Sequence, residues 1–353
     1  MDRAFPHLYA CLMAGGQGAR LWPLSVRTRP KQFLSIFGGE PLLCQAFTRL
    51  DGLLPAERRL VVTLAELREA TAQLLPEVPA ANLLCEPCAR NTAPAAALAL
   101  GTILQRDRAA VIALLPADHR IADAPAFRAA LAEAARQAAE QEAIVTLGVV
   151  PTAPSTAYGY LLCAPPPPGS TEAPACLRVE RFREKPDSAT ARALLATGNC
   201  LWNAGCFVAR ASVLTEAYAR YFPACLPLIE HPERAAELYP ALPSSAIDYA
   251  LAEHCANLLC VPLTCDWDDV GSLEALARHF PQDDHGNTLI GPAVTLDAAG
   301  CIVASQETPP RLTALLGVQD LAVIHTPRAT LVCARAALPR LRELVERVCA
   351  GAR

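Results

Sequence analysis

Three glycines and two cations lie close together near the start of this chain, in the segment CLMAGGQGARLWPLSVRTRPKQF. Gly15, Gly16 and Gly18 allow positive φ angles, and they let backbone N–H groups approach an anion without a Cβ in the way. Arg20 and Lys31 add full positive charges, which stabilise the negative charge that develops as a P–O bond breaks. The spacing therefore indicates a loop that binds a polyphosphate.

The glycines alone also suit a tight turn from a strand into a helix, with two solvated cations beyond it. The segment is not a Walker-type P-loop, because no Gly-Lys-Ser/Thr follows the glycines. It is not a dinucleotide fingerprint either, because the third glycine is missing and an arginine stands near its place. A Rossmann oxidoreductase is therefore a weaker interpretation.

Alternating strands and helices must position this loop. Apolar runs predict buried strands, and Ala-rich runs with helical spacing predict helices between them. The strands are expected at 7–13, 59–63, 109–115 and 142–150, and the helices at 92–105 and 124–140. This order predicts a mainly parallel sheet covered by helices, in which ligands bind beyond the carboxyl ends of the strands. The glycine loop follows the first strand and falls at that edge.

Composition limits the class of protein. The chain has 353 residues, of which 52% are hydrophobic, and a formal net charge of −4. This predicts about two domains with a buried core and no nucleic-acid partner. No apolar run reaches the ~18 residues of a membrane span. Fifteen cysteines in so long a chain do not resemble a small secreted disulfide scaffold, and we expect a reducing cytoplasm.

The pattern changes near residue 285. Short β-type runs separated by Gly and Asp follow, and apolar residues at helical spacing close the chain. We therefore predict an α/β domain over 1–284 and a small β-rich domain with a closing helix over 285–353.

The segment AGGQGARLWPLSVRTRPKQFL resembles the signature of the sugar nucleotidyltransferases, and its LWPLS and PKQF parts are similar to the bacterial mannose-1-phosphate guanylyltransferases. The resemblance continues in order over essentially the whole chain. The matching segments are EPCARNTAPAAALA (86–99), LLPADHRI (114–121), YGY (158–160), FREKPD (182–187), NCLWNAGCFV (199–208), IDYAL (247–251), WDDVGSLEAL (267–276) and LLGVQDLAVIHTPRATLV (315–332).

This resemblance implies a Rossmann-like, mixed, mainly parallel sheet flanked by helices, followed by a C-terminal domain that partly resembles a β-helix. It implies a transferase that moves GMP from GTP to α-D-mannose 1-phosphate with Mg²⁺, by direct in-line attack on the α-phosphorus. The products are GDP-mannose and pyrophosphate. An isomerase domain follows the transferase in longer members, and this sequence stops before it, so a monofunctional short form is expected.

The resemblance also implies roles for particular residues. Arg20 and Lys31 are the expected catalytic cations. The nucleotide is expected near Gly15, Gly16, Gln17, Gly18, Arg90, Asn91, Thr92 and Ala117. The sugar phosphate is expected near Gly159, Glu184, Lys185, Asn203 and Gly205. From the residues alone, the start of RNTAP also suits a helix cap, and Glu184 with Lys185 also suits an ion pair on an edge strand.

A metal site is implied in the same way. Mg²⁺ prefers carboxylate and phosphate oxygens with few protein ligands. The resemblance assigns Asp118 and Asp269 to one Mg²⁺, whereas from the residues alone each aspartate equally suits a turn or a cap. Asp268 is the nearest alternative to Asp269, and Asp269 is preferred because the family's aspartate directly precedes the Val/Thr-Gly pair.

The chain departs from the usual family pattern at a few positions. Ala19, Ala117 and Ala246 stand where the family has Thr or Ser, Asp268 replaces a usual Ser, and Arg328 replaces a usual Asp. None of these changes removes a cation or carboxylate that the chemistry needs.

Two other interpretations stay open. The sugar 1-phosphate could be that of a heptose, fucose or glucose. Alternatively, the chain could be a non-catalytic regulator that binds GDP-mannose, although such a protein would be expected to lose Arg20, Lys31 or one of the aspartates. We expect a cytoplasmic enzyme of polysaccharide biosynthesis that binds GTP and mannose 1-phosphate and neither nucleic acid nor a membrane. A homodimer is one assembly that the sequence allows.

Overall fold

The computed structural model describes residues 5–16, 18–37, 39–165 and 175–351. The chain falls into two compact units. The first unit contains residues 1–15 and 43–267, and the second contains 16–42 and 268–353. The boundary at 284/285 stays a prediction of domain organisation. The compact units differ from it because the segment 16–42, which carries Arg20 and Lys31, packs with the C-terminal residues.

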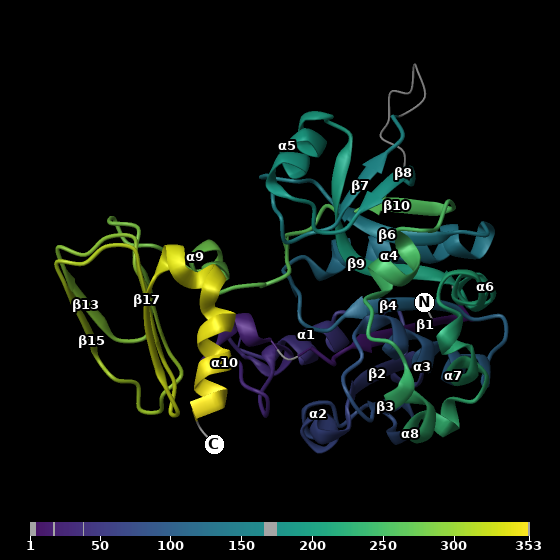
Figure 1. Cartoon of the computed structure of the whole chain (residues 1–353), viewed down its shortest axis with the longest axis horizontal. Helices are drawn as coiled ribbons and strands as arrows, with labels where there is room; N and C mark the ends of the chain where they lie inside the picture. Colours follow the sequence, from purple (N-terminus) through teal and green to yellow (C-terminus); the bar gives the residue numbers. More distant parts are fainter. Residues whose placement is uncertain (1–4, 17, 38, 166–174, 352–353) are drawn as a thin grey trace. The chain divides into compact units, whose positions relative to one another are not determined.

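Within the described residues of the first unit, nine strands form one sheet in the order β3-β2-β1-β4-β9-β6-β10-β8-β7 (Figure 1). Their bounds are β1 Leu8–Met13, β2 Arg59–Leu64, β3 Leu83–Glu86, β4 Val111–Pro116, β6 Ile144–Val149, β7 Tyr160–Cys163, β8 Leu177–Arg183, β9 Cys200–Arg210 and β10 Leu258–Pro262. β1, β2, β3 and β4 pair in parallel, as do β6 and β10. β9 pairs antiparallel with both β4 and β6, so the sheet is mixed.

Helices cover this sheet. Their bounds are α1 Leu42–Thr48, α2 Arg68–Leu74, α3 Thr92–Leu104, α4 Ala124–Glu140, α5 Ser188–Ala196, α6 Ala211–Tyr221, α7 Leu226–Glu230 and α8 Ala235–Leu238. α3 lies against β1, β2 and β3, and α4 lies against β4, β6, β9 and β10. α3 is apolar on every side, because it is enclosed by the sheet and by α6 and α7. The expected mixed α/β architecture is therefore confirmed.

Local sequence explains most of these boundaries. The expected strands at 7–13, 59–63, 109–115 and 142–150 correspond to β1, β2, β4 and β6, and the expected helices correspond to α3 and α4. Asp123 caps α4 by accepting a hydrogen bond from the backbone N–H of Ala126 at 2.9 Å. Later in the chain, a short π-type helix forms over Asp248–Ala252.

The second unit is built from short stacked strands. β12 (Thr288–Ile290), β14 (Ile302–Ser305) and β16 (Leu321–His325) pair in parallel, and β17 (Thr330–Ala334) pairs antiparallel with β16. β13 (Ala293–Leu296) pairs in parallel with β15 (Thr313–Leu316). Left-handed residues, Asp297, Gly300, Gly317 and Asp320, lie in the connections between these strands. The expected β-rich C-terminal region is confirmed.

The N-terminal segment of the second unit contributes to its core. Leu21, Leu24, Leu34 and Phe37 are buried in one cluster with residues from β14, β16 and α10 (Leu341–Gly351). α10 also contacts the 3-10 helix Ala19–Leu21, and α9 (Glu274–His279) contributes Ala275 and Leu276 to the cluster. The apolar residues of the signature segment are thus core residues, and they fix the backbone that carries its cations.

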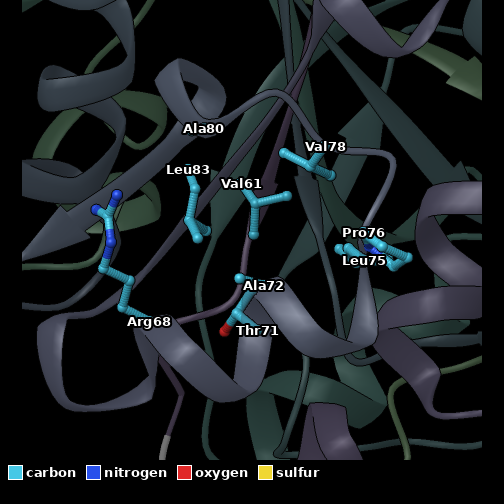
Figure 2. A pocket seen from close by; sticks show the side chains of 9 residues that line it. All are labelled: Val61, Arg68, Thr71, Ala72, Leu75, Pro76, Val78, Ala80 and Leu83. Carbon is cyan, nitrogen blue, oxygen red and sulfur yellow. The ribbon is translucent and has the colours of Figure 1, made fainter.

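Two further features bear on function. Within the part of the chain that the structure describes, no helix combines the length and apolar character needed to cross a membrane. A pocket of about 160 Å³ lies between α2 and strands β2 and β3, with Arg68 as its charged lining residue. Figure 2 shows the side chains that line it. None of the site residues expected from the sequence lines this pocket.

The close packing of α3 against α7 generates a testable prediction. A Cβ on Gly101 would lie 2.5 Å from the backbone oxygen of Ile229. Overpacking costs about 1–3 kcal/mol, and a backbone atom cannot rotate away. The gain in helix propensity from glycine to alanine is only about 1 kcal/mol. We expect Gly101→Ala to lower the free energy of unfolding by about 1–2 kcal/mol in urea denaturation.

Thr102→Ala is the matched control, because Thr102 is the next residue of the same helix. Its hydroxyl donates to the carbonyl of Leu98 at 2.8 Å, a type of bond that contributes little to helix stability. A Gly101→Ala variant as stable as the control would contradict the close contact.

Candidate functional site

In the second unit, Gly18 adjoins Lys31 so closely that no side chain would fit. Gly18 has φ +62°, and a Cβ at this position would lie 2.7 Å from Lys31 Cβ and 2.6 Å from Ser25 Oγ. Both the left-handed backbone and the contact require glycine. Gly16 has open space around it, and Gln17, which was expected at the nucleotide, lies outside the described residues. Arg20 is exposed on the 3-10 helix Ala19–Leu21.

Lys31 is buried and holds a defined partner. Only 7% of the residue is exposed, and its ammonium Nζ donates a hydrogen bond to the backbone carbonyl of Asp269. The structure therefore brings together two residues that are far apart in sequence and that were both expected at the site.

Asp269 lies in a turn that two aspartates hold. Its carboxylate Oδ1 accepts from the N–H of Gly271 at 3.0 Å. The carboxylate of the preceding residue, Asp268, is 6% exposed and accepts hydrogen bonds from Arg278, His279 and the N–H of Val270. Burial alone would raise the pKa of Asp268, but the hydrogen bonds from His279 and Arg278 outweigh it and hold that pKa well below its usual range. Asp268 is thus engaged within the protein.

In the first unit, Gly15 lies against a buried carboxylate. A Cβ on Gly15 would lie 2.5 Å from Glu86 Oε2, and the hydroxyl of Tyr239 donates to Glu86 Oε1. Burial raises the pKa of Glu86 to about 7, although the hydrogen bond from Tyr239 opposes this shift. Glu86 is a site-adjacent acid that sequence reasoning did not single out.

Asp118 follows β4 at the carboxyl edge of the sheet, as expected. Its Oδ1 lies 3.8 Å from His119 Nε2, and His119 Nδ1 accepts from the indole N–H of Trp267 at 3.1 Å. The backbone N–H of Ala117 donates to the carbonyl of Met13 at 3.3 Å. The residues that follow β4 are thus tied to the end of β1 and to Trp267.

The segment expected near guanine is held by backbone and capping contacts. Asn91 has φ +67° and its side chain accepts from the N–H of Thr92 at 2.8 Å, so it caps α3. Thr92 Oγ1 accepts from the N–H of Ile247 at 2.9 Å, and Arg90 donates to the carbonyl of Pro240. The capping interpretation is confirmed, and the nucleotide role of these residues stays a prediction.

The five residues expected at the sugar phosphate lie together in the first unit. Glu184 is buried and forms an ion pair with Lys185, which is the alternative that the sequence left open. A Cβ on Gly159 would lie 2.4 Å from Glu184 Oε2. The carbonyl of Gly159 accepts from the N–H of Asn203 at 2.8 Å, and Asn203 Oδ1 accepts from the N–H of Gly205 at 3.1 Å.

Asp248 joins this cluster, and sequence reasoning missed it. Asn203 Nδ2 donates to Asp248 Oδ1 at 3.0 Å. Burial raises the pKa of Asp248 to about 6, and the negative charge of Glu184 adds to the shift. Asp248 lies within the quoted IDYAL segment, but a single carboxylate in an apolar run gave no further signal. Two acids and one ammonium thus share a partly enclosed surface, which suits hydroxyl groups and one phosphate.

The use of lysine in this chain is informative. Of the 31 Lys and Arg residues, 29 are arginines, which leaves only two lysines, Lys31 and Lys185. An ammonium is a compact charge with three rotatable donors, and a guanidinium cannot replace it in a tight site. Both lysines stand at positions expected to contact phosphate.

The described residues offer few donor groups for a metal ion. Among the described residues, no group of three or more His, Cys, Asp or Glu could hold a metal ion. Mg²⁺ usually takes one or two carboxylates and completes its shell with water and substrate phosphates. The carboxylates of Asp118 and Asp269 are of the right type for this mode of binding.

Two family models and several proteins of known function are similar to this chain. The family model described as "Nucleotidyl transferase" matches residues 9–285, and "MannoseP isomerase/GMP-like beta-helix domain" matches residues 291–348. A "Mannose-1-phosphate guanylyltransferase" of Escherichia coli is 36% identical over 96% of this chain and 73% of that protein. "Xanthan biosynthesis protein XanB" of Xanthomonas campestris pv. campestris is 37% identical over 96% of this chain and 72% of that protein.

A solved structure has the same architecture. The crystal structure of a "mannose-1-phosphate geranyltransferase" from Thermus thermophilus superimposes with a TM-score of 0.87 at 36% identity. The match covers 97% of this chain and 99% of that one, so the fold of both units is shared.

The raised pKa of Asp248 generates a prediction for stability. Its pKa is about 6 in the folded protein against an ordinary 3.8, so the folded state binds this proton more tightly than the unfolded chain. The contribution to stability is therefore greatest below the ordinary pKa and is lost as pH rises through about 6. Asp248→Asn should lose less stability than the parent between about pH 4 and pH 7, by about 1–3 kcal/mol.

Urea denaturation across this pH range measures the difference. Tyr249→Phe is the control, because it alters the neighbouring exposed side chain and leaves the carboxylate in place. Parallel pH profiles for the parent and Asp248→Asn would contradict the prediction.

Proposed function

From the premise that this chain belongs to the nucleotidyl transferase family, and within it to the mannose-1-phosphate guanylyltransferases, we propose that it makes GDP-mannose from mannose 1-phosphate and GTP. The two family models match residues 9–285 and 291–348, so together they cover residues of both units.

The chemistry requires no protein nucleophile. A phosphate oxygen of the sugar phosphate attacks the α-phosphorus of GTP, a new P–O bond forms, and the bond from the α-phosphorus to the β-phosphate oxygen breaks. Pyrophosphate leaves with that electron pair, and GDP-mannose is the other product. The protein must hold two mutually repelling anions in line, and such positioning can supply about 7–11 kcal/mol of the barrier reduction.

Arg20 and Lys31 are expected to contact different phosphate groups. Arg20 is exposed, so its guanidinium is accessible to the departing β- and γ-phosphates. Lys31 is buried and its ammonium is fixed by Asp269, so it serves as a preorganised charge for the α-phosphate. Gly15, Gly16 and Gly18 give the phosphates access to backbone N–H groups.

The cluster around Lys185 suits the sugar phosphate. Lys185 provides the charge for the phosphate, while Glu184 and Asn203 provide acceptors and a donor for hydroxyl groups. Gly159 lets the Glu184 carboxylate approach the backbone closely, and a Cβ on Gly205 would meet no atom nearer than 3.4 Å. Guanine is assigned to the start of α3, beside Arg90, Asn91 and Thr92, with Ala117 on the nucleotide side.

We assign Mg²⁺ to the carboxylates of Asp118 and Asp269. When bound, Mg²⁺ neutralises phosphate charge and orients phosphate oxygens. The two aspartates would supply oxygen ligands to it.

The observation that carries this proposal is the position of the two lysines. In a chain that uses arginine at 29 of its 31 basic positions, both remaining cations are lysines of the candidate site. One is fixed beside the glycine segment in the second unit, and the other lies in the carboxylate cluster of the first.

Pyrophosphate release tests the function directly. The chain is incubated with GTP, mannose 1-phosphate and Mg²⁺, and GDP-mannose is identified as the second product. A panel of heptose, fucose and glucose 1-phosphates and of other nucleoside triphosphates sets the specificity, and a chelator should abolish turnover. Faster turnover with another sugar would reassign the substrate, and binding of GDP-mannose without turnover would favour a regulator.

Arg20 gives the sharpest mutational prediction. Arg20→Ala should lower kcat about 100-fold or more, because one preorganised donor that stabilises developing charge is lost. Arg29→Ala is the matched control. Arg29 is an exposed arginine of the same segment whose Nη1 donates to Gln306 Oε1 at 3.3 Å, so its loss should leave kcat nearly unchanged. Near-normal turnover in Arg20→Ala would remove this residue from the mechanism.

A further inference from the structure

The carboxylate of Asp268 has its hydrogen-bonding capacity filled by partners from one small region. Oδ2 accepts from Arg278 Nε at 2.8 Å and from His279 Nε2 at 2.7 Å. Oδ1 accepts from Arg278 Nη2 at 3.0 Å and from the N–H of Val270 at 2.7 Å. Four hydrogen bonds on two oxygens are close to the limit of a carboxylate, so its orientation is fixed.

These partners anchor the turn to a rigid element. Arg278 and His279 form the last turn of α9. The side chain of His279 is 10% exposed, and its ring packs edge-on against Phe37 with 5.6 Å between ring centroids. Phe37 belongs to the hydrophobic core of the second unit. The carboxylate of Asp268 therefore connects the turn after β11 (Trp267–Asp268) to that core.

The turn needs such an anchor, because its backbone is strained. Val270 has φ +48°, a left-handed conformation that is unfavourable for a β-branched residue. Asp268 Oδ1 holds the N–H of Val270, and Asp269 Oδ1 holds the N–H of Gly271. Two successive aspartates thus impose the path of the chain from residue 268 to residue 271.

The strained turn contains the carbonyl that Lys31 uses. Lys31 Nζ donates to the backbone oxygen of Asp269, which lies between Asp268 and Val270 in the chain. A rotation of this peptide group would move the carbonyl away from the ammonium. The position of Lys31 therefore depends on the geometry that Asp268 imposes.

We propose that Asp268 is a positioning residue that fixes the Asp269 peptide group and, through it, the ammonium of Lys31. Its effect on catalysis rests on the proposed function, whereas its effect on Lys31 does not. A serine at position 268 could still accept from the N–H of Val270, but its short side chain could not also reach Arg278 and His279.

The small number of lysines makes the effect on Lys31 directly measurable. Acetic anhydride labels amines, and mass spectrometry then reports Lys31 and Lys185 separately as the only two lysines of the chain. In the parent, Lys31 should react more slowly than Lys185, because 7% of Lys31 is exposed against 49% of the Lys185 side chain. Lys185 lies in the first unit and serves as the internal reference.

We expect Asp268→Ser to raise the labelling rate of Lys31 relative to Lys185 by about fivefold, the change expected when a hydrogen bond of ordinary strength is lost. Arg278→Ala removes the other partner of the contact between Asp268 and Arg278, so it should also raise the labelling rate of Lys31 relative to Lys185. The Arg278 side chain is 46% exposed, so this second variant disturbs folding least and decides the question if Asp268→Ser does not fold.

Asp283→Ser is the matched control. Asp283 also anchors a turn of the second unit, since its carboxylate accepts from the N–H groups of His285 and Asn287, but this turn is a different one from that at residues 268–271. A Lys31 labelling ratio in Asp268→Ser and Arg278→Ala no greater than in Asp283→Ser would overturn the proposal.

Kinetics separate positioning from general stability. Asp268→Ser should lower kcat for pyrophosphate release about tenfold, since misplacement of a catalytic group by about 1 Å can cost up to about 100-fold. The KM for mannose 1-phosphate should stay unchanged, because Glu184, Lys185 and Asn203 are untouched. Asp268→Asn, which unlike serine keeps an Oδ1 acceptor for both Val270 and Arg278, should recover part of kcat. An unchanged kcat in Asp268→Ser with a raised Lys31 labelling ratio would restrict Asp268 to a structural role and overturn its role in catalysis.

If the parent releases no pyrophosphate from GTP and mannose 1-phosphate, the proposed function fails. The labelling ratio still decides whether Asp268 positions Lys31, so the two failures are distinguishable.

Discussion

The burial of four apolar side chains, Leu21, Leu24, Leu34 and Phe37, fixes the segment that carries the two expected catalytic cations. These residues pack against the C-terminal strands and α10 of the second unit. Hydrophobic burial is non-directional, so it sets where the segment lies but not how Lys31 points. The close approach of Gly18 restricts the Lys31 side chain sterically, and the directional hydrogen bond to the Asp269 carbonyl orients its ammonium.

The cluster of Glu184, Lys185, Asn203 and Asp248 in the first unit depends on a balance between charged groups. Glu184 is buried, and Asp248 is half-buried in the same cluster. Burial raises the pKa of Asp248 to about 6, and the negative charge of Glu184 adds to this shift. Lys185 offsets this repulsion through its ion pair with Glu184. Under the proposed function, the phosphate of the substrate would compete with Glu184 for the ammonium of Lys185. Sugar hydroxyls are suitable partners for the acceptors that this exchange releases.

Three acidic residues support other residues of the candidate site in ways that composition could not reveal. Asp268 holds a strained turn, Asp248 orients Asn203, and Glu86 adjoins Gly15. Each lies within a segment that resembles the family, yet its role depends on partners that are distant in sequence. Tyr239 is the clearest example, because its hydroxyl donates to Glu86 across 153 positions of the chain.

The sequence by itself determined the strands β1, β2, β4 and β6 and the helices α3 and α4, because apolar periodicity and capping are local properties. It also identified Gly18, since a left-handed residue after a strand favours glycine. Only the tertiary structure decided that residues 16–42 pack with the C-terminal part and that Lys31 binds the Asp269 carbonyl. The tertiary structure also distinguished the contacts of Asp268 from those of Asp269, although these two adjacent residues are of the same type. The reason is physical: these outcomes depend on which surfaces meet after folding, and a linear pattern of residue types does not specify that.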